Sequence, residues 1–373
     1  WGDYAREAAF LAIEEINSSN FLGHEHSLQL LPENMIDYHC WPSNAAKMAE
    51  TLFQNDILIL TGADCSSPAV EISKIASKYK IPVISNGANA SSLSSREDFP
   101  WFIRVVTPSE EYDRYLIELA HSMGINEIAY LYTTDAWGLG ARKVIHDSVN
   151  KKNILIKKEF GFKRDTNQET INDYISEIIN VGIKSIVITG PTPDTVRIFK
   201  SLDKYEFNKK GNTIFATEMI SADESIDAVN GSTGYFAPMT FLENTEELSQ
   251  FKIELSSKLD KKIDINSKAF FYGALSYDHI YTIAHAINSI NSKNQVVTPK
   301  SLIDSLRKVD FNGVTGRVYF SQKSNDRINM PLQIMNSHGF DESSNSVKFE
   351  SIATVSSDGN LVIDHSKILL PGY

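Results

Sequence analysis

The sequence has 373 residues, of which 42% are hydrophobic and 22% are charged, with a mean hydropathy of −0.22. These ordinary values exclude a disordered chain, and the length exceeds what one hydrophobic core usually organises, so we expect two lobes. A net charge of −11 opposes a broad phosphate-binding surface and excludes nucleic acid as an expected partner. No run approaches the roughly 18 apolar residues of a membrane span, and the chain opens on Trp1 without a signal peptide, which indicates a mature or trimmed fragment.

Apolar residues recur at helical spacing from Tyr4 to Ile16, and the polar run 17–20 predicts the end of that helix. Short apolar runs then alternate with helical stretches. The predicted strands are 56–62, 81–85, 127–132, 154–159, 185–190 and 213–216, and the predicted helices between them are 68–79, 108–122, 136–151, 168–181 and 195–202. Beyond Gly234 the pattern predicts helices over 246–259, 269–290 and 299–308, followed by three or four short strands.

Buried strands that alternate with helices of about 12 to 15 residues are typical of parallel sheets covered on both faces. The sequence therefore predicts an α/β fold with doubly wound parallel sheets. Ligands of such sheets bind beyond the carboxyl ends of the strands, so the turns that matter follow Leu60, Ile84, Tyr132, Ile188 and Ala216.

Two of these turns are small and polar. The first, 61–68, reads TGADCSSP, where a serine suits the helix cap and Pro68 suits the first helical turn. Free amides at a helix start and a nearby hydroxyl suit a carboxylate, although a plain helix cap explains the same residues. The second turn, 85–91, reads SNGANAS, and we expect Gly87 and Asn89 to face the same spot.

At these turns the sequence resembles the type I periplasmic-binding-protein superfamily, which includes amino-acid-binding proteins of bacterial transporters and ligand-binding domains of receptors. The resemblance covers nearly the whole chain. Its markers, in chain order, are Trp1-Gly2-Asp3, GADCSSPA, IPVISNGANASSLSS, FPWFIRVVTPS, Trp137-Gly138-Leu139-Gly140, Thr217-Glu218, Tyr277-Asp278 and FNGVTGRVYF.

The resemblance implies how an amino acid would bind. Ser66 supplies a hydroxyl to the ligand's α-carboxylate, and Gly87 and Asn89 form the second pair of contacts, with Asn89 standing where a threonine is usual. The family's acidic partner for the ligand's ammonium falls on Glu218, and the alternative there is a charge at a helix start.

The resemblance also implies the walls of the pocket. Trp1 and Trp137 fall on aromatic positions that flank the ligand, with Trp137 replacing a tyrosine, and ordinary packing between lobes is the alternative. Tyr272, with its neighbours Phe270 and Phe271, lines the side-chain end, while at least one of the three is expected in the core. Ala5 and Tyr272 stand where glutamate receptors carry basic residues, which disfavours an acidic ligand.

Cys40 and Cys65 are the only cysteines. The resemblance implies a disulfide between them that braces the first turn, and two free thiols are the alternative. Such a bridge would stabilise the fold by about 3 kcal/mol and implies an oxidising compartment, periplasmic or extracellular.

Enzymatic motifs are missing from the sequence: it has no GxSxG, no GxxxxGK[ST] and no HExxH, and its nine histidines lack metal-ligand spacing. We therefore expect no catalytic residue, no cofactor and no metal.

The resemblance places lobe 1 at 1–106 and 239–330 and lobe 2 at 107–238 and 331–373, joined by a three-stranded hinge. Lobe 1 would anchor the ligand and lobe 2 would close over it. Two functions remain: a binding component that delivers a neutral amino acid to the permease of an ABC-type transporter, and the ectodomain of a receptor joined to a membrane domain. Members of the family also begin with a β-strand before the Trp1-Gly2-Asp3 loop, and the sequence does not include that strand.

Overall fold

The computed structural model describes residues 2–31, 39–208, 211–217, 230–240, 242–265, 267–341, 346–356 and 359–370. The chain forms two compact units: unit 1 comprises Trp1–Pro108 and Leu242–Met330, and unit 2 comprises Ser109–Phe241 and Pro331–Tyr373. The chain therefore passes between the units three times.

Unit 1 is built around a small parallel sheet with the strand order β1-β2-β3 and a separate antiparallel pair, β9 and β10. Its elements are α1 (Gly2–Ser18), α2 (Pro42–Leu52), β1 (Leu60–Thr61), α3 (Ser66–Tyr79), β2 (Val83–Ser85), the 3-10 helix Ser91–Ser94, β3 (Phe102–Arg104), α9 (Glu246–Leu259), α10 (Lys268–Asn291), α11 (Pro299–Leu306), β9 (Asp310–Gly313) and β10 (Gly316–Tyr319).

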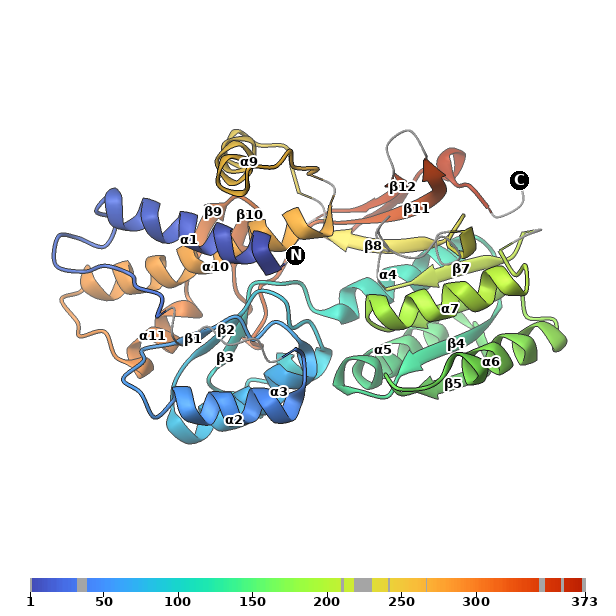
Figure 1. Cartoon of the computed structure of the whole chain (residues 1–373), viewed down its shortest axis with the longest axis horizontal. Coiled ribbons are helices and arrows are strands. Elements are labelled where there is room, and N and C mark those ends of the chain that lie inside the picture. The colour runs from blue at the N-terminus through green and yellow to red at the C-terminus, as the bar shows by residue number, and fades with distance from the viewer. Residues whose placement is uncertain are drawn as a thin grey trace. The chain divides into compact units, whose positions relative to one another are not determined.

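Helices cover both faces of the sheet in unit 1. In Figure 1, α1 and α10 lie side by side on one face, and α2 and α3 lie on the other. The core on the first face joins apolar residues of α1, the sheet, α10 and α11, including Ile16, Ile84, Ile283 and Leu302. The predicted helices of this unit are confirmed to within a few residues, and α2 is an additional helix.

The strand predicted at 56–62 is shorter and less buried than expected. Only Leu60 and Thr61 form β1, and both remain half-buried. A fully buried strand needs a neighbour on each side, and among the described residues β1 has hydrogen-bonded neighbours in β2 alone. Only the end of the apolar run 56–62 therefore forms a strand.

Two of the family's sequence markers meet in the core of unit 1. The carboxylate of Asp278 in α10 accepts hydrogen bonds from the backbone amides of Val314 and Thr315, each at 2.8 Å, and from the Thr315 hydroxyl. The buried guanidinium of Arg327 donates to that hydroxyl at 2.7 Å. Asp278 thus fixes the turn between β9 and β10, and a Cβ atom at Gly313 would lie 2.3 Å from its Oδ1.

Unit 2 contains one sheet with the strand order β13-β12-β11-β8-β7-β6-β4-β5. Its elements are α4 (Ser109–Ser122), β4 (Glu127–Thr133), α5 (Ala136–Lys152), β5 (Leu155–Phe162), α6 (Gln168–Asn180), β6 (Ser185–Thr189), α7 (Thr192–Lys204), β7 (Thr213–Ala216), β8 (Phe236–Thr240), β11 (Leu332–Asp341), β12 (Ser346–Val355), β13 (Leu361–Ile363) and the 3-10 helix His365–Lys367.

Side chains of the central strands alternate between two cores. On β4, Ala129 and Leu131 pack with α6 and α7, whereas Ile128 and Tyr130 pack with α4 and α5. Figure 1 shows these helix pairs on the two faces of the sheet. Burial on both faces explains why the strands of this unit read as continuous apolar runs.

The predicted doubly wound α/β fold is confirmed, with one addition. Strands β5, β4, β6, β7 and β8 run parallel, but β8, β11, β12 and β13 pair antiparallel at the other edge. The sheet of unit 2 is therefore mixed, and β11 and β12 have ten residues each instead of forming short strands. No helix within the described residues is long and apolar enough to cross a membrane.

Candidate functional site

The two small polar turns of unit 1 lie against each other. A Cβ atom at Gly87 would lie 2.8 Å from the carbonyl oxygen of Asp64, so only glycine fits without a shift of the neighbouring loop. The hydroxyl of Ser66 accepts a hydrogen bond from the amide of Ala90 at 3.1 Å, and the hydroxyl of Ser85 donates to the carbonyl of Ala63 at 2.7 Å. The sequence correctly placed both turns at one edge of the sheet.

The start of α3 differs from the prediction in one detail. Cys65, not a serine, occupies the N-cap position, and its side chain makes no capping hydrogen bond. Ser66 and Ser67 are the first two helical residues, and the Ser67 hydroxyl is buried without a partner among the described residues. A helix start without a side-chain cap keeps the positive end of the helix dipole available to an anion.

Asn89 is half-buried on the second turn, and a buried arginine supports that turn from within unit 1. Arg104 is fully buried in β3 and donates to the carbonyls of Ala88 and Ala90, at 3.1 and 2.8 Å. Its charge is balanced by Asp326, whose carboxylate lies 2.7 Å from the Arg104 Nε. Because the two carbonyls flank Asn89, Arg104 determines the path of the chain at this predicted contact residue.

The predicted disulfide between Cys40 and Cys65 is present, with Cα atoms 5.6 Å apart. Because Cys65 directly precedes Ser66, the bridge ties the start of α3 to the segment that precedes α2. The disulfide and the Arg104 contacts restrain the two turns independently, which is the rigid support that a binding site needs.

A titratable group that the sequence did not single out lies in the first turn. Burial raises the pKa of Asp64 from about 3.8 to about 7, although a hydrogen bond from the backbone of Asn86 lowers it in part. The Asp64 carboxyl is therefore partly protonated near neutral pH, beside the position predicted to hold a carboxylate.

We expect the stability of unit 1 to depend on pH through Asp64. A carboxyl whose pKa is higher in the folded state than in the unfolded state stabilises the fold below its unfolded pKa, and this contribution is lost as the pH rises through about 7. Between pH 5 and pH 8 the free energy of unfolding should fall by about 2–3 kcal/mol more in the parent chain than in Asp64→Asn. Urea unfolding at the two pH values measures the difference. If the free energy of unfolding changed equally with pH in the parent chain and in Asp64→Asn, the assignment would be contradicted.

In unit 2, three loops meet at the carboxyl edge of β4, β6 and β7. A Cβ atom at Gly138 would lie 1.8 Å from the carbonyl oxygen of Thr133, and one at Gly190 would lie 3.2 Å from the Thr133 methyl group. Trp137 is 8% exposed, and its Nε1 is buried without a partner in the described part of the chain. The buried hydroxyl of Thr217 at the end of β7 likewise has none there.

Of the remaining predicted contact residues, the structure describes Tyr272 only. Trp1 and Glu218 lie outside the described residues. Tyr272 is half-buried in α10 of unit 1, where its ring is 5.4 Å from that of Phe271. Phe270 and Phe271 are both buried in the core of unit 1, in agreement with the expectation for at least one of the three.

Charged residues near these loops make ordinary structural contacts. Asp135 caps α5 by accepting a hydrogen bond from the amide of Gly138 at 2.9 Å, and Arg142 pairs with Glu159 on the surface. Among the described residues, no group of three acidic, histidine or cysteine side chains gathers in a way that would hold a metal ion.

The fold and the two loop clusters define a ligand-binding protein of the type I periplasmic-binding-protein class. Residues 4–339 match the family model described as "Receptor family ligand binding region", and the chain belongs to that family.

Sequence relatives are receptors. The chain is 23% identical over 354 residues to glutamate receptor 3.7 of Arabidopsis thaliana, covering 87% of this chain and 37% of the receptor. It is 24% identical over 355 residues to gamma-aminobutyric acid type B receptor subunit 1 of Mus musculus, covering 86% of this chain and 36% of that protein. The chain thus spans little more than a third of the curated relatives that it matches.

Two solved structures with a similar fold are binding proteins of ABC transporters. A substrate-binding protein of an ABC transporter from Desulfitobacterium hafniense, in complex with Leu, superposes with a TM-score of 0.71 at 18% identity, covering 93% of this chain and 95% of that one. A solute-binding protein from Rhodopseudomonas palustris BisB5, in complex with 3,4-dihydroxybenzoic acid, gives a TM-score of 0.76 at 14% identity, covering 98% and 94%.

Proposed function

We propose that the protein is an extracytoplasmic, non-catalytic binding protein that captures a small neutral amino acid or a close analogue. The observation that supports this most directly is the contact between the two turns of unit 1: the amide of Ala90 donates to Ser66 at the uncapped start of α3, and Gly87 packs against Asp64. Backbone amides at a helix start together with a hydroxyl form a site for a carboxylate.

In this proposal, unit 2 supplies the rest of the ligand's contacts. Trp137 provides an aromatic wall whose Nε1 needs a hydrogen-bond acceptor, and Glu218 pairs with the ammonium group. Because each unit supplies only part of the contacts, binding favours the arrangement in which both units hold the ligand together, and this couples binding to hinge closure. The same proposal assigns two roles to the lobes. The anchoring lobe is 1–106 with 239–330, and the closing lobe is 107–238 with 331–373.

The ligand's side chain is proposed to be neutral. Ala5 and Tyr272 offer no positive charge to a distal carboxylate, and a structural neighbour that was solved with Leu supports an apolar amino acid. Other members of the fold accept different carboxylates, as the complex with 3,4-dihydroxybenzoic acid illustrates, so aromatic acids belong in the same ligand screen.

The partner is proposed to be an ABC-type permease, to which the protein delivers its ligand. Structural neighbours of matching length are components of such transporters. A second candidate is the ectodomain of a membrane receptor, which the sequence relatives favour. The continuation of the gene beyond Tyr373 discriminates between them, because a transmembrane segment supports the receptor and a stop codon supports transport.

We expect neutral amino acids to raise the melting temperature of the protein, and Ser66→Ala to weaken binding about 10- to 100-fold, since a hydrogen bond to a charged group contributes about 1.5–3 kcal/mol. A thermal-shift screen over the common amino acids and aromatic acids measures this. Ser92→Ala is the matched control, because Ser92 is an exposed serine of the same unit. A ligand whose affinity is unchanged in Ser66→Ala would refute the assigned carboxylate site.

A further inference from the structure

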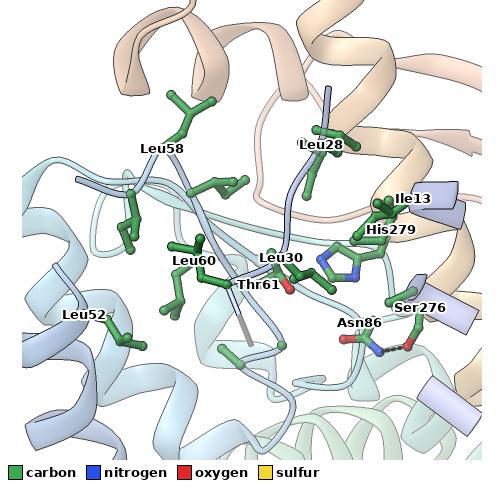
Figure 2. A pocket seen from close by; sticks show the side chains of 18 of the residues that line it. Ile13, Leu28, Leu30, Leu52, Leu58, Leu60, Thr61, Asn86, Ser276 and His279 are labelled. Carbon is green, nitrogen blue, oxygen red and sulfur yellow. Dashed lines mark hydrogen bonds between the residues drawn. The ribbon is translucent and has the colours of Figure 1, made fainter. Parts of the chain in front are cut away.

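Each unit contains a buried polar side chain that has no partner in the described part of the chain, and the two side chains differ in charge. In unit 1, Figure 2 shows the ring of His279 at one side of an apolar pocket, next to the hydrogen bond from Asn86 to Ser276. Neither ring nitrogen of His279 has a partner among the described residues, but burial lowers its pKa to about 3 and keeps the ring neutral. A neutral ring needs no counter-charge, so this pocket gives no reason to expect an ion.

In unit 2 the corresponding group is a carboxyl. Asp113 lies in the second turn of α4 and is fully buried, and neither of its carboxylate oxygens has a hydrogen-bond or ion-pair partner among the described residues. The buried carboxylate of Asp326, by contrast, pairs with Arg104. An ionised carboxylate inside a core is strongly disfavoured unless a positive charge balances it. Asp113 therefore needs a balancing charge that the described side chains do not supply.

Hydroxyl groups lie around Asp113. Ser109 is one turn earlier on the same face of α4, is 1% exposed, and its hydroxyl likewise has no partner in the described ranges. Burial and then the negative charge of Asp113 raise the pKa of Tyr130 in β4, which places the Tyr130 hydroxyl near that carboxyl. The same hydroxyl donates to Thr189 at 3.1 Å. The first two turns of α4 thus face a polar part of the sheet.

Two threonines at the carboxyl ends of β6 and β7 belong to this polar part. Val187 and Phe215 pack in the core under α4 and α5. Side chains two residues apart share a face of a sheet, so Thr189 and Thr217 point to that side as well. They are neighbours, because the amide of Thr217 donates to the carbonyl of Ile188 at 3.0 Å. The buried Thr217 hydroxyl has no partner among the described residues, so it is a further oxygen atom that faces α4 unpaired.

The chemistry of this group is that of a cation site. Its unpaired atoms are the carboxylate oxygens of Asp113 and the hydroxyl oxygens of Ser109 and Thr217. Oxygen atoms are the ligands that hard cations prefer. One carboxylate among hydroxyls balances one positive charge, which favours a monovalent ion over calcium, whose sites in proteins usually combine several carboxylates.

We propose that Asp113, Ser109 and Thr217 bind a sodium ion inside unit 2, between the first two turns of α4 and the carboxyl ends of β6 and β7. The ion neutralises the carboxylate and ties α4 to the sheet. It lies at the edge where Trp137 begins the neighbouring helix α5, so it supports the part of unit 2 that contributes to the proposed amino-acid site. Because the folded unit alone assembles these ligands, sodium stabilises the fold by mass action.

A proton on Asp113 is the competing occupant. Burial, together with the nearby charge of Glu110, raises the pKa of Asp113 well above its usual range. A proton would remove the charge of the carboxyl, but it would leave at least one of the Ser109 and Thr217 hydroxyls unpaired. Buried polar groups are nearly always paired in folded proteins, and a sodium ion takes the carboxylate and both hydroxyls as ligands.

Thermal melting of the protein without amino acid tests the proposal in two salts of equal ionic strength, sodium chloride and choline chloride. Choline is too large for a buried site, and equal ionic strength cancels the screening of surface charges. We expect saturating sodium to raise the melting temperature of unit 2 by about 5 °C. Equal melting temperatures in the two salts would overturn the proposal and leave a proton as the occupant. A rise with calcium chloride but not with sodium chloride would contradict the monovalent ion.

Variants locate the sodium effect. Asp113→Asn keeps the shape of the side chain but removes its charge, so it should abolish the response to sodium and melt above the parent in choline chloride. Ser109→Ala should raise the sodium concentration needed for half of the effect about 10-fold. Asp147→Asn, at an exposed aspartate of α5, is the matched control and should keep the full response.

A sodium response that persists in Asp113→Asn would refute the assigned site. Ser109→Ala keeps the test decisive if Asp113→Asn does not fold, because an unchanged sodium response in Ser109→Ala would also contradict the proposal. The melting experiments contain no amino acid, so their failure leaves the proposed function standing.

Discussion

Replacing Asp326 with alanine is expected to lower the free energy of unfolding of unit 1 by about 3–5 kcal/mol, because it leaves the fully buried guanidinium of Arg104 without its counter-charge. Arg104 would still donate to the carbonyls of Ala88 and Ala90, which hold its charge inside the core. Urea unfolding, followed by hydrogen exchange of peptides from unit 1, measures the loss.

The exposed pair of Arg317 and Asp310 provides the matched control in the same unit. Its side chains are 59% and 49% exposed, so Asp310→Ala should cost no more than about 1 kcal/mol. Equal costs for Asp310→Ala and Asp326→Ala would contradict the structural role given to Arg104. Arg104→Met should also weaken ligand binding, since it releases both carbonyls that flank Asn89.

Gly138→Ala is expected to destabilise unit 2 by about 3 kcal/mol or more, because the new methyl group would lie 1.8 Å from the carbonyl oxygen of Thr133. The clash is with the backbone of Thr133 at the end of β4, so no side-chain rotation relieves it. Relief requires α5 to move away from β4, which would also displace Trp137 from the loop edge.

The neighbouring residue gives the control for this substitution. Leu139 is 50% exposed, and Leu139→Ala removes apolar contacts without any clash. Its free energy of unfolding, measured with urea, should stay within about 0.5 kcal/mol of that of the parent chain. If Gly138→Ala were equally mild, the close packing of α5 on β4 would be wrong.

The sequence predicted unit 2 more accurately than unit 1. Strands β4, β6 and β7 are buried on both faces, so their continuous apolar runs predict both the strands and where they end. The run 56–62 has the same composition, yet it forms a strand over only Leu60 and Thr61. A strand's length depends on the neighbours that it pairs with, and this information lies outside the run itself.

Helices were predicted well where they begin at a recognisable cap. Asn167, Thr245 and Ser267 each accept a hydrogen bond from the first turn of the helix that follows. In α2 the N-cap position is Trp41, which has no capping side chain, although Pro42 and the spacing of Ala45, Ala49 and Leu52 were available as signals.

The loops of the candidate site could be predicted from the sequence, but the buried residues that hold those loops in place could not. Ser66 and Gly87 follow strands that end at one edge of a parallel sheet, so pattern alone brings them together. The pair Arg104–Asp326 joins residues 222 positions apart in the sequence, and no local spacing indicates it. Asp64 was overlooked for a related reason, since its raised pKa comes from tertiary burial.

Titration calorimetry with matched ligand analogues tests the central claim most directly. The best amino acid from the screen is compared with its α-carboxamide and its N-acetyl derivative, in the parent protein, Ser66→Ala and Glu218→Ala. We predict that the parent protein binds the carboxamide at least 10-fold more weakly than the amino acid, and that Ser66→Ala lowers the affinity for the carboxamide little further. The N-acetyl derivative should likewise bind the parent more weakly, and Glu218→Ala should lower its affinity little further. Binding that is unaffected by both substitutions, or analogues that lose affinity equally in all three proteins, would contradict an amino acid held by its carboxylate and ammonium groups.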